Sequence, residues 1–345
     1  MPCLNRDIIF AIGKKLVEDG DPVAVMKFAL SGKKQLYEMR NVFASVTFLD
    51  LNEGYYGIGW GHKIGKFYYK NGEELPLKFF MDCIGDSIIN LHLNYSHIRR
   101  TIYQPFIDKI VKKKKLVTFS FSPEILMEQT FFDDFLPQFA ATLKHVSIPS
   151  SYMTPKFRDS FILESLTVLD QFNFELPLFC CKTTSLTLAD KCNPYPNGSY
   201  NDFIEKYPEL NSGLTSIKRI YFKYDFCSFF FNFERSRISL TDLMNYFPSV
   251  ELIQFTFPLI ILTKSFVLNY IQFYTYVLQE STKFPPKIVI DFSIKTMNSF
   301  NLDCWKEICS GFEFDESVTT FYCFRKSVQS HGDESAVLEV RIPKF

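Results

Sequence analysis

The amino-acid sequence predicts an α/β protein: a short three-helix module, then a β-rich entry segment, then a long array of strand–helix units. Two observations carry this prediction. Apolar side chains recur at helical spacing near the N-terminus, and a six-residue apolar frame recurs from residue 88 onward. The expected regions are the helical module at 1–42, the entry segment with a hairpin at 43–86, and the array at 87–345.

The first helix is predicted from the stretch DIIFAIGKKL, where one apolar stripe consists of Ile8, Ile9, Ile12 and Leu16. Gly20 should end this helix, and Asp21-Pro22 should begin a second one, because a capping residue followed by proline is typical of a helix start. A third short helix is expected at 33–40. A short terminal helix is marginal alone, so its stripe must be buried in this protein or against a partner.

The entry segment changes pattern at Phe43, where apolar and polar residues begin to alternate and glycine and tyrosine become frequent. Asn71-Gly72 is a strong turn signal, so strands and a hairpin are expected here. The stretch GYYGIGWGHKIG has three spaced glycines but no surrounding βαβ unit. It is interpreted as a glycine-containing hairpin and not as a nucleotide-binding loop.

The array is predicted from the frame apolar-x-x-apolar-x-apolar, whose copies begin 20 to 34 residues apart. Its clearest copies are IINLHL (88–93), LVTFSF (116–121), LKHVSI (143–148), LESLTV (163–168), TTSLTL (183–188), IKRIYF (217–222) and VELIQF (250–255), with weaker ones near 290, 318–323 and 337–342. Helices are expected between the strands at 131–143, 200–210, 240–250 and 265–278. One such unit cannot bury its own apolar face, so stacked units should share a core. Frame positions should point inward and intervening ones, including His92 and His145, outward.

Composition and charge argue against several classes of protein. Lys plus Arg and Asp plus Glu both number 38, so no basic excess favours nucleic acid, and the run Lys112–Lys115 is interpreted as a solvated helix end. The 9 cysteines are irregularly spaced, which favours reduced thiols in a cytoplasmic or nuclear protein without a metal site. The longest apolar stretch contains Pro258 and Lys264, so a core strand followed by a buried helix is expected and no membrane segment.

Catalytic motifs are not recognisable. None of the 5 histidines lies in HExxH, and neither GxSxG nor GxxxxGK[ST] occurs. Carboxylate pairs such as Asp133-Asp134 are interpreted as helix surface. The sequence therefore predicts a protein that is not an enzyme and needs no cofactor.

The recurring frame resembles an irregular leucine-rich repeat with Phe, Ile and Val in place of many leucines. The N-terminal helices resemble an F-box, and the whole chain is similar to the nematode class of F-box proteins with divergent repeats. The residues that follow the F-box pattern are Leu4, Asp7, Ile8, Ile9, Ile12, Leu16, Asp21, Pro22, Val23, Val25, Met26, Ala29, Leu30, Ser31 and Lys33. The chain departs from it at Asn5, where the family has proline, in four extra residues at 17–20, and in lacking a tryptophan near Gln35.

This resemblance implies a substrate-receptor subunit of a Skp–cullin–F-box ubiquitin ligase. The helices would bind a Skp-like adaptor through Leu4, Ile8, Ile9, Ile12, Leu16, Pro22, Val23, Met26 and Leu30. An unidentified target protein would bind the outward strand positions of the array, for which the repeat register selects Arg219, Tyr221, Lys223, Gln254 and Thr256.

A second hypothesis stays open from the residues alone. The chain would then be a repeat scaffold for protein–protein interaction, and its N-terminal helices would only cap the open end of the array. As a docking surface, the stripe should tolerate Ile9→Glu or Ile12→Glu without unfolding but lose the adaptor. As a cap, it should lose several kcal/mol of stability on the same changes.

Overall fold

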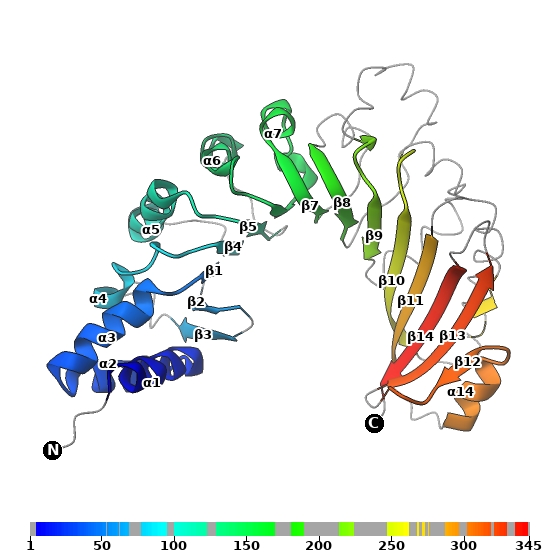
Figure 1. Cartoon of the computed structure of the whole chain (residues 1–345), viewed down its shortest axis with the longest axis horizontal. Coiled ribbons are helices and arrows are strands. Elements are labelled where there is room, and N and C mark those ends of the chain that lie inside the picture. Colours follow the sequence, from blue (N-terminus) through cyan, green and yellow to red (C-terminus); the bar gives the residue numbers. More distant parts are fainter. Residues whose placement is uncertain are drawn as a thin grey trace. The chain divides into compact units, whose positions relative to one another are not determined.

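The structure of the chain is a computed structural model (Figure 1). It describes residues 5–52, 54–61, 63–68, 77–94, 100–122, 129–169, 181–189, 214–223, 247–261, 268, 271–272, 275, 287–296, 302–318, 321–329 and 335–343. The architecture is mixed α/β with a mostly parallel sheet that does not close on itself. The chain divides into two compact units, Met1–Tyr152 with Asp159–Leu163 and Met153–Arg158 with Glu164–Phe345.

The three predicted N-terminal helices are confirmed as α1 (Arg6–Asp19), α2 (Pro22–Leu30) and α3 (Lys33–Ala44). Asn5 caps α1, because its side chain accepts a hydrogen bond from the Asp7 backbone N–H. Gly20 ends the helix with a φ of 72°, a left-handed conformation that favours glycine. Asp21 caps α2 by accepting from the backbone N–H groups of Val23 and Ala24.

The entry segment forms three antiparallel strands, β1 (Phe48–Asn52), β2 (Tyr55–Trp60) and β3 (Lys63–Tyr68). The glycine-containing stretch is therefore a hairpin, as predicted, and Gly61 makes its turn with a φ of 62°. The expected turn at Asn71-Gly72 lies outside the described residues. A short helix, α4 (Lys78–Met81), follows.

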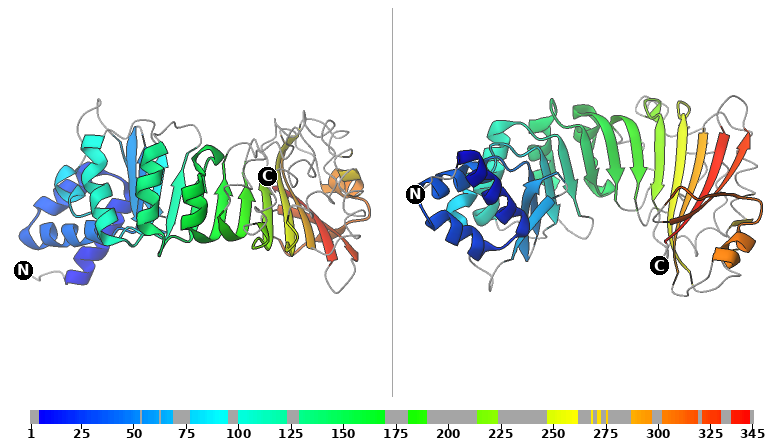
Figure 2. Two further views of the ribbon diagram at one scale, coloured as in Figure 1. Left: turned by 90° about the horizontal axis from the view of Figure 1, so that it is seen from above. Right: turned by 60° about the horizontal axis from the view of Figure 1, so that its bottom comes forward.

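In the first unit, β1 also pairs in parallel with β4 (Asn90–Asn94). Strand β4 pairs in parallel with β5 (Thr118–Phe121), and β5 pairs in parallel with β6 (His145–Ile148). The strand order is β3-β2-β1-β4-β5-β6. Figures 1 and 2 show α4, α5 (Arg100–Lys113) and α6 (Gln129–Phe135) along one face of these strands. Phe119 and Phe121 of β5 pack there against Phe132 of α6, with ring centroids 6.1 and 5.0 Å apart.

The second unit continues the parallel pattern and ends in an antiparallel edge. From β7, its strand order is β7-β8-β9-β10-β11-β14-β13-β12. The strands are β7 (Ile162–Val168), β8 (Lys182–Leu188), β9 (Arg219–Lys223), β10 (Leu252–Ile261), β11 (Lys287–Thr296), β12 (Glu313–Asp315), β13 (Phe321–Gln329) and β14 (Ser335–Pro343). Shorter elements are η1 (Leu136–Phe139), η2 (Ser150–Tyr152), α7 (Pro155–Ser160) and α14 (Leu302–Ile308).

The repeated frame predicts the strands correctly, since every copy, including the weaker ones, contains or overlaps a strand. The first position of each strong copy is buried, although it lies before its strand or is the second residue of it. These residues are Ile88, Leu116, Leu143, Leu163, Thr183, Ile217 and Val250. The two later apolar positions are buried as well, apart from the partly buried Phe255, which supports the inward assignment of the frame; of the outward positions, Ser185 is buried. Winding of the units into a solenoid stays a prediction.

Several smaller predictions can be compared with the structure. The core strand expected in the longest apolar stretch is β10, which includes Pro258 and runs on to Ile261. Lys112 and Lys113 lie in the last turn of α5, where Lys113 pairs with Asp86 at 3.0 Å. The helix expected around 131–143 is α6 followed by η1. The helices expected at 200–210, 240–250 and 265–278 lie wholly or mostly outside the described residues.

Candidate functional site

The apolar stripe of α1 has an inner and an outer side. Ile9 is 2% exposed and lies with Gly13 and Val17 on the side that is buried in the protein itself. Ile8, one residue earlier, is 48% exposed, and Ile12 is also exposed. Neighbouring helix residues differ by about 100° in direction, so one stripe read from sequence can contain both sides.

The inner side of α1 packs closely on α3. A Cβ atom on Gly13 would lie 2.6 Å from the Met39 sulfur and 3.1 Å from a Val42 methyl carbon, so the glycine permits the close approach. Arg6 adds an ion pair to Glu38 of α3 at 2.6 Å. These contacts set the orientation of α1, and with it the direction of the outer side.

The C-terminal turn of α1 packs on the hairpin. A Cβ atom on Gly65 of β3 would collide with the carbonyl oxygen of Val17, so the two backbones touch directly. Trp60 of β2 donates its indole N–H to the carbonyl oxygen of Ser45 at 2.9 Å, and Lys14 lies over the same indole ring. The four extra residues at 17–20 therefore extend α1 and attach it to the sheet.

The predicted adaptor-binding residues fall into four groups. Ile8, Ile12, Val23 and Leu30 are exposed, the last at 71%, and are called here the outer helical residues. Leu16, Pro22 and Met26 are partly buried, and Ile9 is buried. Leu4 lies outside the described residues. The burial of Ile9 gives it a role in the core of the module, so its substitution reports on folding first.

The predicted target-binding residues are adjacent on one face of the second unit's sheet. On β9, Arg219, Tyr221 and Lys223 alternate with buried Ile220 and Phe222. The parallel register of β9 and β10 places Tyr221 opposite Gln254 and Lys223 opposite Thr256. Side chains at matched positions of neighbouring strands share a face, so the strands bring all five predicted residues together.

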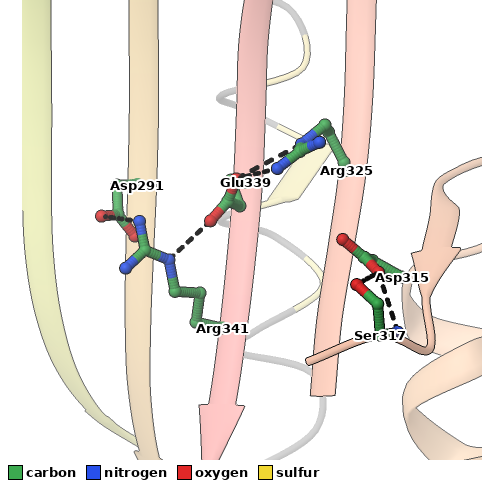
Figure 3. A network of polar contacts seen from close by, with 6 residues as sticks. All are labelled: Asp291, Asp315, Ser317, Arg325, Glu339 and Arg341. Atoms are coloured by element: carbon green, nitrogen blue, oxygen red, sulfur yellow. Dashed lines mark hydrogen bonds and ion pairs between the residues drawn. The ribbon is translucent and has the colours of Figure 1, made fainter. Parts of the chain in front are cut away.

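The row that contains Lys223 and Thr256 continues across the sheet to a charged network that the sequence analysis did not predict. Thr256 is opposite Asp291 of β11, Asp291 is opposite Glu339 of β14, and Glu339 is opposite Arg325 of β13. Figure 3 shows Arg341 reaching between the two carboxylates while Arg325 contacts Glu339 from the other side. The network therefore crosses three strands.

The network contains two carboxylates and two guanidinium groups. Arg341 binds Asp291 at 2.9 Å through Nη2 and Glu339 through Nε, and Arg325 binds Glu339 at 2.9 Å through Nη2. A separate pair beside it, Asp315 and Ser317, closes a turn through a hydroxyl hydrogen bond of 2.6 Å. Formal charges cancel within the four-residue network.

The two carboxylates of the network differ in their ionisation. Burial raises the pKa of Asp291 above its ordinary value, which the shared Arg341 only partly opposes and the Glu339 charge reinforces. Burial also acts on Glu339, but hydrogen bonds from Arg325 and Arg341 outweigh it and lower the pKa of that carboxyl. The Oδ1 atom of Asp291 is buried and has no hydrogen-bond partner among the residues that the structure describes.

A weak sequence signal for this network exists. Glu339 and Arg341 occupy the outward positions of the copy VLEVRI, and Asp291 interrupts an apolar strand. Their meeting could not be inferred, because β11 pairs with β14 and not with the strands that come between them in sequence. Buried charge inside a strand is nevertheless a reason to look for a cation on the neighbouring strand.

The first unit carries a polar network of its own around Asp50 of β1. Asn52 donates to one carboxylate oxygen at 3.0 Å, Tyr55 donates to the other at 3.3 Å, and the Nδ1 atom of His92 lies 3.2 Å from the first. Asn94 donates in turn to the Asn52 side chain at 2.8 Å. His92 thus lies on the outward face, as the frame predicts, and contacts a buried carboxylate there.

Two other kinds of site do not occur in the part of the chain that the structure describes. In the described parts of the chain, no group of three or more His, Cys, Asp or Glu side chains is arranged to hold a metal ion. None of the helices in those parts has the length and apolarity needed to cross a membrane. Neither a model of a known protein family nor a curated protein matches the sequence significantly.

Proposed function

We propose that the chain is a non-catalytic substrate receptor of a Skp–cullin–F-box type ubiquitin ligase. Its N-terminal helices would hold a Skp-like adaptor, and the β9–β10 face would hold a target protein. The observation that carries the proposal is the exposure of the outer helical residues in a module that is otherwise well packed. Single exposed apolar residues are ordinary, but four on two successive helices favour a binding role.

Two departures from the F-box pattern are compatible with this proposal. Asn5 replaces the family's proline but supplies the N-cap of α1 through its side chain, so the helix start is kept by other means. The added residues at 17–20 lie at the far end of α1 from Ile8 and face the hairpin through Val17. Neither change removes an outer helical residue.

The second candidate is a repeat scaffold whose helices serve only as a cap, and one observation favours it. The inner side of α1 covers part of the hairpin through direct backbone contact between Val17 and Gly65. Together with the packing of Gly13 on α3, this contact accounts for the buried side of α1 without any partner. It does not account for the exposure of Ile8, Val23 and Leu30.

A pull-down with a purified Skp-like adaptor distinguishes the two candidates. The test variant combines Ile8→Glu with Ile12→Glu, which places charge on the outer side of α1. A matched control, Lys34→Glu, makes the same change in net charge at an exposed position in the first turn of α3 that is not part of the F-box pattern. The receptor proposal expects adaptor binding by the wild type and the control, at least about tenfold weaker binding by the double variant, and equal thermal unfolding of all three.

Ile9→Glu serves as the folding control in the same experiment. It places a charge at a buried position, so it should unfold several degrees earlier and lose binding for that reason. Wild-type protein that does not bind any adaptor tested would favour the scaffold. A double variant that binds as well as the wild type would also contradict the proposed docking surface.

A further inference from the structure

Strand β9 presents three hydrogen-bond donors in a line, and none of them has a partner within the protein's described residues. Arg219, Tyr221 and Lys223 lie on one face at alternate positions, and the two cations are exposed. No ion pair, side-chain hydrogen bond or aromatic-ring contact involves these three side chains. The line therefore offers a guanidinium, a phenol hydroxyl and an ammonium group with no acceptor to satisfy them.

Cations elsewhere in the structure are used differently. Arg6 binds Glu38, Arg40 lies over the ring of Phe79, and Arg325 and Arg341 both bind Glu339. Among the described residues neither Arg219 nor Lys223 has such a contact, although the row of Lys223 and Thr256 contains an acidic residue. That acid, Asp291, is two strands from β9 and is already bound by Arg341. The positive charge of β9 is thus left unbalanced at the surface.

The neighbouring strand adds polar side chains to the line. Gln254 is opposite Tyr221, and its amide donates to the hydroxyl of Thr256 at 3.4 Å. On the other side, the β8 residues opposite Arg219 and Tyr221 are Ser185 and Thr187. No acidic side chain occupies a described outward position next to the line on either strand.

We propose that β9 binds an extended, acidic segment of a protein partner. The inference rests on the proposed function, because it names the chemical class of the target. Side chains on one face of a strand repeat every ~7 Å, which is also the spacing of alternate residues in an extended peptide. Carboxylates at alternate positions of such a segment would accept hydrogen bonds from Arg219 and Lys223, and from Tyr221 between them.

A peptide is a better match to this face than a nucleic acid. Only two unpaired cations lie in the line, and the chain has a formal net charge of zero. Binding to a phosphate backbone draws on many cations at once. A short acidic segment needs only the contacts that β9 supplies.

The experiment measures binding of a fluorescein-labelled peptide of alternating Glu and Ser to the full chain by fluorescence anisotropy. The comparison peptide has Gln in place of Glu. We expect saturable binding of the Glu peptide, weakening as salt rises because exposed charges are screened, and no binding of the Gln peptide at the same concentrations.

The test variant combines Arg219→Gln with Lys223→Gln, which lowers the net charge by as much as the control below, and should weaken binding of the Glu peptide by about tenfold. The matched control is Lys182→Glu. Lys182 is exposed and begins β8, and it does not belong to the row of Ser185 and Thr187 that lies beside the β9 line. This control should change binding by less than about twofold. Circular dichroism melts of all proteins should coincide, since every altered side chain is exposed.

Three outcomes would overturn the inference: similar binding of the Glu and Gln peptides, an equal loss in the Lys182→Glu control, or tighter binding of a single-stranded oligonucleotide than of the Glu peptide. The measurement uses the chain without an adaptor. A failed adaptor pull-down with intact peptide binding would therefore reject the ligase role alone, and the reverse result would reject the acidic target alone.

Discussion

Asp50 in the first unit and Asp291 in the second are both buried carboxylates on the outward face of a strand, yet they are stabilised in different ways. Asp50 accepts from two side chains of its own hairpin and contacts His92 on the adjacent strand. Asp291 depends on one arginine, which it shares with Glu339, and one of its oxygens has no partner among the described residues.

The difference shows two solutions to the cost of burying charge. Around Asp50, several modest donors divide the task, so the loss of one donor leaves the others in place. Around Asp291, a single guanidinium serves two carboxylates, so its loss leaves two like charges close together in a poorly hydrated place. We expect the second network to be more sensitive to a single substitution.

The largest expected effect is that of Arg341→Ala. This change should lower the free energy of unfolding by about 3 kcal/mol, because it leaves Asp291 and Glu339 without their common cation. Urea unfolding at neutral pH measures it. Adding Asp291→Asn should restore part of the loss by removing one of the two charges, and the single change Asp291→Asn should itself be nearly neutral. A double variant no more stable than Arg341→Ala would contradict this account of the network.

A smaller effect is expected at Asp50. Asp50→Ala should cost about 2 kcal/mol, since it leaves the donors of Asn52 and Tyr55 unpaired and also removes the contact of His92. The same urea experiment applies. Asn90→Ala is a suitable control, because Asn90 lies on the same face of β4 and is partly exposed. If Asp50→Ala and Asn90→Ala lost equal stability, the network around Asp50 would have no stabilising role beyond that of an ordinary polar residue on this face.

The smallest effect concerns acid stability and tests the two pKa directions. Because the folded pKa of Glu339 is lowered, its contribution to stability is present above its unfolded pKa and is lost as pH falls through the folded value. Arg325→Gln removes one cause of that lowering, so acid unfolding should begin at a higher pH, with a loss of about 1 kcal/mol at neutral pH. Circular dichroism during acid titration would show the shift.

Asp291 should act in the opposite direction in that titration. Its folded pKa is raised, so its contribution is fully present below the unfolded pKa and is lost as pH rises through the folded value. The wild type should gain free energy of unfolding when acid protonates Asp291, and the Asp291→Asn variant should lack this gain. An acid transition unchanged in both variants would mean that the network is irrelevant to acid stability.

The sequence predicted the strands of the array because the frame repeats the same physical requirement in each of its copies. Residues such as Ile217 and Val250 are buried at the same frame position, and Tyr221 and Gln254 occupy equal positions in successive copies. In a parallel sheet, equal positions lie side by side, so the β9–β10 face could be selected without a structure. The identity of a target carries no such repeated signal.

Two features could not be predicted, for separate physical reasons. The contact of Arg341 with Asp291 depends on strand order, which places β14 beside β11, and no local pattern encodes that choice. Ile8 is exposed and Ile9 is buried because of the way α1 packs, with its close approach to Met39 at Gly13. Periodicity gives the existence of an apolar stripe, but packing decides which of its members remain exposed.

The hydrogen bond from Trp60 to Ser45 has a practical consequence for optical work. The sequence has 2 tryptophans, and the second, Trp305, is buried in α14 of the other unit. In a Trp305→Phe protein, the remaining indole emission would come from Trp60, which connects the hairpin to the end of α3 through its hydrogen bond to Ser45. A red shift of that emission on warming would report the loosening of the N-terminal helices, in real time and without any attached dye.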